Sequence, residues 1–121
     1  MPTAPLNLDI VLRRTGNNLP LLRELIEIFL EETPEHLRSL RAAIDAGDFS
    51  KIHLFAHCIR GSVSYFGDGD TERAAIALEK MGRNADAGGL EAAWCDLSET
   101  LGRLLESAAA TPIPSPSVEK R

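Results

Sequence analysis

The sequence has few aromatic residues, no excess of positive charge and no long apolar run. Aromatic side chains make up 5% of the 121 residues, so stacking platforms for nucleic-acid bases are not expected. The formal net charge is −5 with both signs mixed along the chain, which argues against binding to nucleic acid or to an anionic membrane. No segment approaches the roughly 20 apolar residues that cross a bilayer. These absences predict a small domain that contacts neither nucleic acid nor membrane.

Cysteine is also scarce, with Cys58 and Cys95 the two examples. Two cysteines are too few for a disulfide scaffold, and the first residues lack the basic and apolar segments of a secretory signal. We therefore expect reduced thiols in a cytoplasmic protein. The chain length suits one domain whose core needs neither disulfides nor metal.

Apolar residues recur at helical spacing, and no segment alternates in the way that a strand would. The apolar stripes are, in chain order, Leu22, Leu25, Ile26, Phe29 and Leu30; Leu37, Leu40, Ala43 and Ile44; Ile52, Phe55, Ala56, Ile59, Val63 and Phe66; Ala74, Ala75, Leu78 and Met81; and Leu90, Ala93, Trp94, Leu97, Leu101, Leu104, Leu105 and Ala108. A shorter pattern starts at Leu6. We predict an all-α fold, an antiparallel four-helix bundle with a short additional N-terminal helix.

Turn and cap residues predict the boundaries between these helices. Gly16 and Asn17 end the first helix, and Gly47 followed by Asp48 separates two longer ones. Thr33 followed by Pro34 resembles a helix start, so a kink or a break is expected near residue 33. The predicted organisation is a flexible lead-in over 1–5, a helical bundle over 6–110 and a disordered Pro/Ser-rich tail over 111–121.

One stretch, residues 56–67, combines a histidine, a cation and a glycine within a helical pattern. At about 100° per residue, the apolar stripe of this helix lies opposite His57, which is therefore predicted to face solvent. Gly61 lies about 40° from His57, and Arg60 about 60° to the other side. A glycine inside a helix costs about 1 kcal/mol relative to alanine, and Gly61 lies away from the core stripe. We interpret Gly61 as clearance for a bulky partner beside the imidazole.

Two different flanks border His57 on this helix. One is polar and cationic and the other is partly apolar; their members are His53, Arg60 and Ser64 on the first and Leu54, Cys58 and Tyr65 on the second. We interpret Ser64, with Gly61, as shaping access to the histidine. His53, Leu54, Cys58 and Tyr65 form a candidate docking rim. The alternative, of about equal weight, is that Leu54 and Tyr65 pack beneath a neighbouring helix.

Neutral imidazole is a nucleophile at physiological pH and can take and release a phosphoryl group. Phosphoryl transfer depends mainly on in-line positioning and on neutralising the transferring oxygens. An exposed histidine, an open glycine beside it and one cation therefore form a sufficient half-site. A partner must supply the other half.

This stretch resembles the histidine-containing phosphotransfer (HPt) domain of two-component phosphorelays. The family pattern is a histidine, any residue, an aliphatic residue, lysine and glycine, then small residues and a second glycine. This chain has His57, Cys58, Ile59, Arg60, Gly61 and Ser62, with Phe66 and Gly67 closing the pattern. The likeness extends from about Leu8 to Leu105 and includes Phe29–Pro34, Ala46–Asp48, Leu78–Glu79 and Gly82–Arg83. Arg60 stands where lysine is usual, and Val63 where a smaller residue is common.

The resemblance implies a bundle in which His57 is the phosphoacceptor and Arg60 stabilises the phosphoryl group. That group would arrive from an aspartate of one receiver domain and leave for an aspartate of another, including receivers of hybrid sensor histidine kinases. We expect a monomeric phosphocarrier rather than an enzyme, because the sequence has no ATP-binding motif. It needs no cofactor of its own, and Mg²⁺ is expected on the partner receiver. We expect a cytoplasmic location, either as a separate protein or as the cytosolic terminal domain of a membrane sensor kinase.

Two other functions fit the same residues. A helical adaptor could bind a signalling partner through this face while the histidine is never phosphorylated. A metal site could use His53 and His57, which are four residues apart on one helical face, but the sequence offers no clear further ligands. The metal reading is the weaker, and no metal ligand is assigned.

Overall fold

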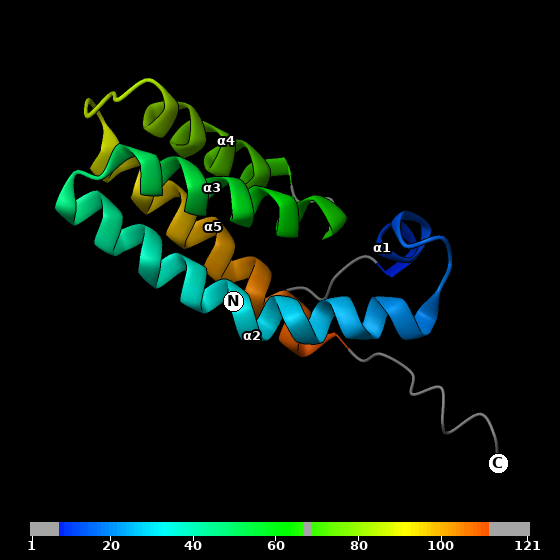
Figure 1. Cartoon of the computed structure of the whole chain (residues 1–121). Coiled ribbons are helices and arrows are strands. Elements are labelled where there is room, and N and C mark those ends of the chain that lie inside the picture. The colour runs from blue at the N-terminus through cyan, green and yellow to red at the C-terminus, as the bar shows by residue number, and fades with distance from the viewer. Residues whose placement is uncertain (1–7, 67–68, 112–121) are drawn as a thin grey trace, which may run out of the picture.

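The computed structural model describes residues 8–66 and 69–111, and the regular elements within those ranges are all helical (Figure 1). They are α1 (Leu8–Arg14), α2 (Leu19–Ala46), α3 (Phe49–Val63), the short 3₁₀ helix η1 (Ser64–Phe66), α4 (Gly69–Arg83) and α5 (Leu90–Ala110). Helices α2 to α5 form an antiparallel bundle, and α1 is the short additional helix. The predicted fold class is confirmed.

A kink or a break was predicted near residue 33, within helix α2. The helix runs without a break from Leu19 to Ala46, so the break is wrong and the kink is the alternative that remains. Pro34 removes one backbone hydrogen bond, but Phe29 before it and Leu40 after it are both buried in the same core, which holds the helix together. The ribbon bends between its blue N-terminal half and its cyan-green C-terminal half (Figure 1), as an internal proline favours.

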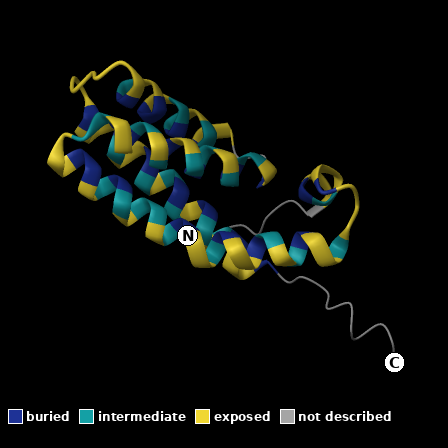
Figure 2. Ribbon diagram, viewed as in Figure 1, coloured by how far each residue is buried: buried dark blue, intermediate teal, exposed yellow. Residues whose placement is uncertain are grey.

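The predicted apolar stripes meet in the interior of the bundle. Buried positions, dark blue in Figure 2, line the inward side of each long helix. Ile52, Ala56, Ile59 and Val63 of α3 are completely buried, so the side of α3 opposite this stripe is left for solvent. Within the described ranges, no helix is long and apolar enough to cross a membrane.

Gly82 allows α3 and α4 to approach each other closely. A Cβ atom added to this glycine would lie 2.4 Å from the backbone nitrogen of His53 and 2.9 Å from the backbone oxygen of Phe49. Contacts that short do not occur between real atoms, so any larger residue would push the two helices apart. Gly82 therefore sets the spacing between the two helices that carry the polar cluster described below.

Helix α1 lies beside the N-terminal half of α2 and the end of α3 (Figure 1). Val11 is completely buried, and the Arg14 side chain donates a 2.6 Å hydrogen bond to the Ser64 carbonyl. The predicted helix end is confirmed by Gly16 and Asn17, which both have positive φ angles of 69° and 59°. The lead-in over 1–5 and nearly all of the predicted tail lie outside the described residues. Thr111, the first residue of that tail, is buried against the end of α5.

Candidate functional site

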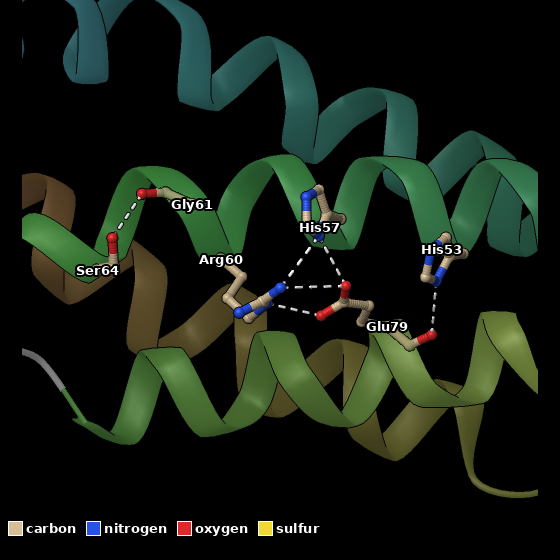
Figure 3. A network of polar contacts seen from close by, with 6 residues as sticks. All are labelled: His53, His57, Arg60, Gly61, Ser64 and Glu79. Atoms are coloured by element: carbon tan, nitrogen blue, oxygen red, sulfur yellow. Dashed lines mark hydrogen bonds and ion pairs between the residues drawn. The ribbon is translucent and has the colours of Figure 1, made fainter.

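The surface of α3 that faces away from its apolar stripe carries His57. Its side chain is 56% exposed, which confirms the solvent-facing position predicted from the helical wheel. Asp48 starts α3 by accepting a hydrogen bond from the Lys51 backbone, and the helix then places His53, His57 and Arg60 along the edge that faces α4 (Figure 3). These three side chains point toward one residue of α4.

That residue is Glu79, whose carboxylate joins two of the α3 side chains. Nδ1 of His57 lies 2.7 Å from its Oε2, and Nε of Arg60 lies 2.7 Å from its Oε1. Nη2 of Arg60 lies 3.4 Å from Oε2 (Figure 3). The Glu79 side chain is only 9% exposed, so a carboxylate that has lost most of its water is compensated by hydrogen bonds and positive charge.

The contact with Glu79 determines which tautomer His57 adopts. A carboxylate oxygen only accepts hydrogen bonds, so the 2.7 Å contact places the ring proton on Nδ1. Nη2 of Arg60 also lies 3.1 Å from Nδ1, but Nδ1 is closer to Oε2, at 2.7 Å, and Nη2 has its own contact with Oε2 at 3.4 Å, so we assign the Nδ1 proton to the bond with the carboxylate. The neutral ring has one proton, and therefore Nε2 carries a free lone pair. The exposed side chain presents this nucleophilic nitrogen to a partner.

Glu79 remains ionised because of its two neighbours. Burial on its own raises the pKa of the Glu79 carboxyl, but the hydrogen bonds from His57 and Arg60, with the charge of Arg60, outweigh burial and hold that pKa below its usual value. The carboxylate therefore orients the imidazole and is negatively charged at neutral pH. It can balance positive charge that develops on the ring during a reaction.

Gly61 lies in open space on the exposed side of α3. A Cβ atom added to it would meet no atom within 4 Å, apart from its own helix, so the residue leaves room beside His57. Ser64 does not contact the His57–Arg60–Glu79 cluster (Figure 3). Its hydroxyl donates a 2.8 Å hydrogen bond to the Gly61 carbonyl, and its own carbonyl accepts from Arg14, so it completes the end of α3.

The structure separates the four residues of the predicted docking rim. His53 lies on the α4 side, where its Nδ1 is 3.2 Å from the backbone oxygen of Glu79. Leu54 and Tyr65 are 51% and 41% exposed, so they do not pack beneath a neighbouring helix in the described part of the chain. Tyr65 and Cys58 line a groove of about 290 Å³ between α2 and α3, which we call the α2–α3 groove; its other lining residues are Leu25, Ile28, Phe29, Glu32, Gly61, Ser62 and Phe66.

The metal-site alternative finds little support in the geometry. Residues 8–66 and 69–111 contain no group of three or more histidine, cysteine or acidic side chains able to hold a metal ion. Nδ1 of both His53 and His57 is directed at Glu79, through the backbone oxygen in one case and the carboxylate in the other.

Glu79 is the functional residue that sequence reasoning did not single out. It was part of the wider family likeness, as Leu78–Glu79, without an assigned role. Its position in the helical pattern is the signal that could have found it. Glu79 is an acidic residue on the inward side of α4, which it shares with Ala75, Leu78 and Gly82. A buried acid needs a partner, and a basic or imidazole side chain on the neighbouring helix is the usual one.

A helical bundle that presents an exposed imidazole, with its second nitrogen held by a buried carboxylate and an arginine alongside, has the parts that a histidine phosphocarrier needs. The model of the Hpt domain family matches residues 24–111, and the chain therefore belongs to that family. Hpt domains carry phosphoryl groups on histidine in two-component phosphorelays and interact with receiver domains, as the sequence resemblance implied.

A solved structure gives the same fold. The crystal structure of the HPT domain from a sensor hybrid histidine kinase of Shewanella superposes with a TM-score of 0.74 at 24% sequence identity. The superposition covers 85% of this chain and 88% of the other. No curated protein sequence matches this chain.

Proposed function

We propose that His57 accepts a phosphoryl group from the aspartyl phosphate of one receiver domain and passes it to the aspartate of another. The observation that carries this proposal is the 2.7 Å contact between Nδ1 of His57 and the Glu79 carboxylate. It leaves Nε2 as the nucleophile on an exposed side chain, and it holds the ring in one orientation for in-line attack.

The bonding changes during transfer balance on this chain's own residues. The lone pair of Nε2 forms the bond to phosphorus, while the bond from phosphorus to the aspartate oxygen breaks and its electron pair stays on that carboxylate. The Nδ1 proton remains on the ring, which becomes cationic. Glu79 offsets this charge, as a buried carboxylate does for the imidazolium in a catalytic triad. A cationic ring is also a good leaving group, so the next receiver can take the phosphoryl group.

In this proposal Arg60 has two tasks, because it binds the Glu79 carboxylate and also contacts the transferred phosphoryl group. Its Nε and Nη2 are directed at Glu79, and Nη1 makes no hydrogen bond to any residue that the structure describes. The side chain is 35% exposed, so Nη1 can approach a phosphoryl oxygen on Nε2 of His57. Arginine in place of lysine suits this double task, because its planar fork can bind two groups at once.

We place receiver docking on the face that carries the α2–α3 groove. Exposed apolar side chains gather there, with Ile28 at 42% and Tyr65 at 41% exposure, and Gly61 leaves the surface open next to His57. Large exposed apolar side chains around a groove are typical of protein interfaces. A receiver bound there would bring its aspartate to the exposed Nε2 without crossing the Glu79 side of α3.

The chain acts in this proposal as a monomeric phosphocarrier in the cytoplasm, and it catalyses nothing alone. The receiver provides the aspartate and the Mg²⁺ that neutralises the phosphoryl oxygens. No cofactor is assigned to this chain itself.

The test is incubation of the purified domain with a radiolabelled phosphorylated receiver. We expect label on the wild-type domain and none on His57→Gln, with recovery of label on a second receiver added afterwards. His36→Gln is the matched control, because His36 lies on α2 with its ring against Phe55, away from His57. Label on His57→Gln, or no label on the wild type from any receiver tried, would contradict the proposal.

A further inference from the structure

His53 stands beside His57 in an arrangement that the phosphoacceptor role leaves unused. The two residues are one helical turn apart, their rings are inclined by only 21°, and the ring centroids lie 6.3 Å apart (Figure 3). Both line a cleft of about 590 Å³ between α3 and α4, together with Arg60, Ile76, Glu79 and Arg83. We call this the α3–α4 cleft.

Glu79 anchors both rings, through different atoms. Its carboxylate binds Nδ1 of His57, and its backbone oxygen lies 3.2 Å from Nδ1 of His53. A carbonyl oxygen only accepts hydrogen bonds, so Nδ1 of His53 carries a proton. Nε2 is then the one position of His53 that changes with protonation. It is an acceptor in the neutral ring and a donor in the cationic ring.

The α3–α4 cleft has little net positive charge for a phosphorylated His57. Two arginines, Arg60 and Arg83, and one acid, Glu79, line it, and Glu79 offsets the charge of Arg60. A phosphoryl group brings roughly 1.5 to 2 negative charges at neutral pH and strong acceptor oxygens. The charged or titratable groups facing His53 are His57 and Arg60 from α3, and Glu79 and Arg83 from α4. A proton on His53 is the additional positive charge that the cleft can gain.

The spacing of the rings also suits a bridge by one phosphoryl oxygen. A charge-assisted hydrogen bond needs about 2.8 Å between heavy atoms. The 6.3 Å between ring centroids leaves room for an oxygen attached through phosphorus to His57 to reach the neighbouring ring. His53 is also partly exposed, so its Nε2 can exchange a proton with water.

We propose that His53 is a second phosphoryl-binding residue, which takes up a proton from water at Nε2 when His57 is phosphorylated and donates it to a phosphoryl oxygen. The inference rests on the proposed role of His57. When the phosphoryl group leaves for a receiver, Nε2 of His53 returns the proton to water. The distribution of phosphoryl groups between this domain and a receiver therefore depends on pH through His53.

The test is side-chain ¹H–¹⁵N NMR of the histidines before and after phosphorylation of the domain with phosphoramidate, which needs no receiver. We expect Nδ1 of His53 to be protonated in both states, and Nε2 to hold its proton to higher pH in the phosphorylated domain. An unchanged His53 titration in a domain phosphorylated on His57 would overturn the inference and leave the proposed function intact. Absence of phosphorylation at His57 from phosphoramidate and from receivers would refute the proposed function itself.

Two variants separate binding by His53 from a structural role. His53→Asn keeps a donor for the Glu79 backbone oxygen but removes Nε2, whereas His53→Gln places an uncharged amide near the Nε2 position. In a mixture with one receiver between pH 6 and 8, we expect the wild-type share of label on the domain to rise as pH falls. Both variants should lose most of that rise. At pH 6, the equilibrium constant for phosphoryl transfer from the receiver to the domain should be about tenfold lower in each variant than in wild type. His36→Gln should follow wild type, and variants that match the wild-type pH dependence would overturn the inference.

Discussion

The two sides of α3 differ in kind although they share one helix. On the α4 side, Gly82 brings the backbones close together and a buried carboxylate fixes two side chains of α3. On the α2 side, the α2–α3 groove is open, partly apolar and bordered by exposed Tyr65. The first side holds the tautomer and direction of His57, and the second is the surface on which we propose that a receiver docks. We call the α4 side, with Glu79 and Gly82, the chemical flank, and the α2 side, with Tyr65 and the α2–α3 groove, the recognition flank. Because they lie on opposite sides of α3, a substitution can alter one without the other.

The largest expected effect on the fold, and through it on transfer, comes from Gly82→Ala. The added Cβ would overlap the backbone of α3, which cannot rotate away, so the helices must separate. We expect a loss of about 2–3 kcal/mol in the free energy of unfolding and a transfer rate at least tenfold lower. Urea unfolding and label transfer measure the two quantities. Full stability with normal transfer would show that α3 and α4 do not need this close contact.

Glu79→Gln tests the chemical flank alone. Glutamine keeps the size of the side chain, but it can accept from Nδ1 without offsetting the charge on the ring. We expect transfer to slow by about a hundredfold, with little change in the concentration of receiver that gives half-maximal rate. Single-turnover transfer over a range of receiver concentrations separates the two parameters. A change confined to receiver affinity would place Glu79 in recognition instead.

Tyr65→Ala tests the recognition flank. Removing an exposed aromatic side chain beside the α2–α3 groove should weaken receiver binding by about fivefold to tenfold, as for an interface side chain of moderate importance. The rate at saturating receiver should stay within about twofold of wild type. Titration calorimetry and the same transfer assay give both values. A reduced saturated rate with unchanged affinity would reverse the assignment of the two flanks.

Gly61 offers a smaller test on the same open face. Gly61→Ala should raise the free energy of unfolding by about 0.5–1 kcal/mol, because alanine favours a helix and its Cβ meets open space. Gly61→Gln should keep the fold but slow transfer by about threefold to tenfold, since its side chain occupies the clearance next to His57. Thermal unfolding and label transfer check the pair. Equal transfer by both variants would remove the clearance role.

The smallest effect is a pH dependence of stability. The pKa of Glu79 is lowered in the folded protein, so its contribution is complete above the usual value of 4.5 and is lost as pH falls through the folded value. We expect Glu79→Gln to lose less stability than wild type between pH 6 and pH 3. Thermal unfolding over that range measures the difference. Parallel curves for the two proteins would mean that Glu79 is not held ionised by the fold.

The sequence predicted what depends on one helix and missed what depends on two. The exposed position of His57, the clearance at Gly61 and the ends at Gly16 and Gly47 all follow from local periodicity and backbone preference. The pairing of α3 with α4 does not, and so Glu79 and the role of Gly82 became visible only with the helices packed together. Of the kink or break expected near residue 33, the break failed for a related reason. Core contacts on both sides of Pro34 outweigh its local preference.

The arrangement around Glu79 has a consequence for the quality of a signal. His57 acquires a fixed tautomer and a neutralising carboxylate only when α3 and α4 are packed at the distance that Gly82 allows. An unfolded or partly folded copy contains the same histidine without that preparation. Such a copy would be a poor acceptor and would withdraw little phosphate from active receivers. The ability to accept a phosphoryl group is therefore a product of folding, and phosphorylation marks the copies in which α3 and α4 are packed together.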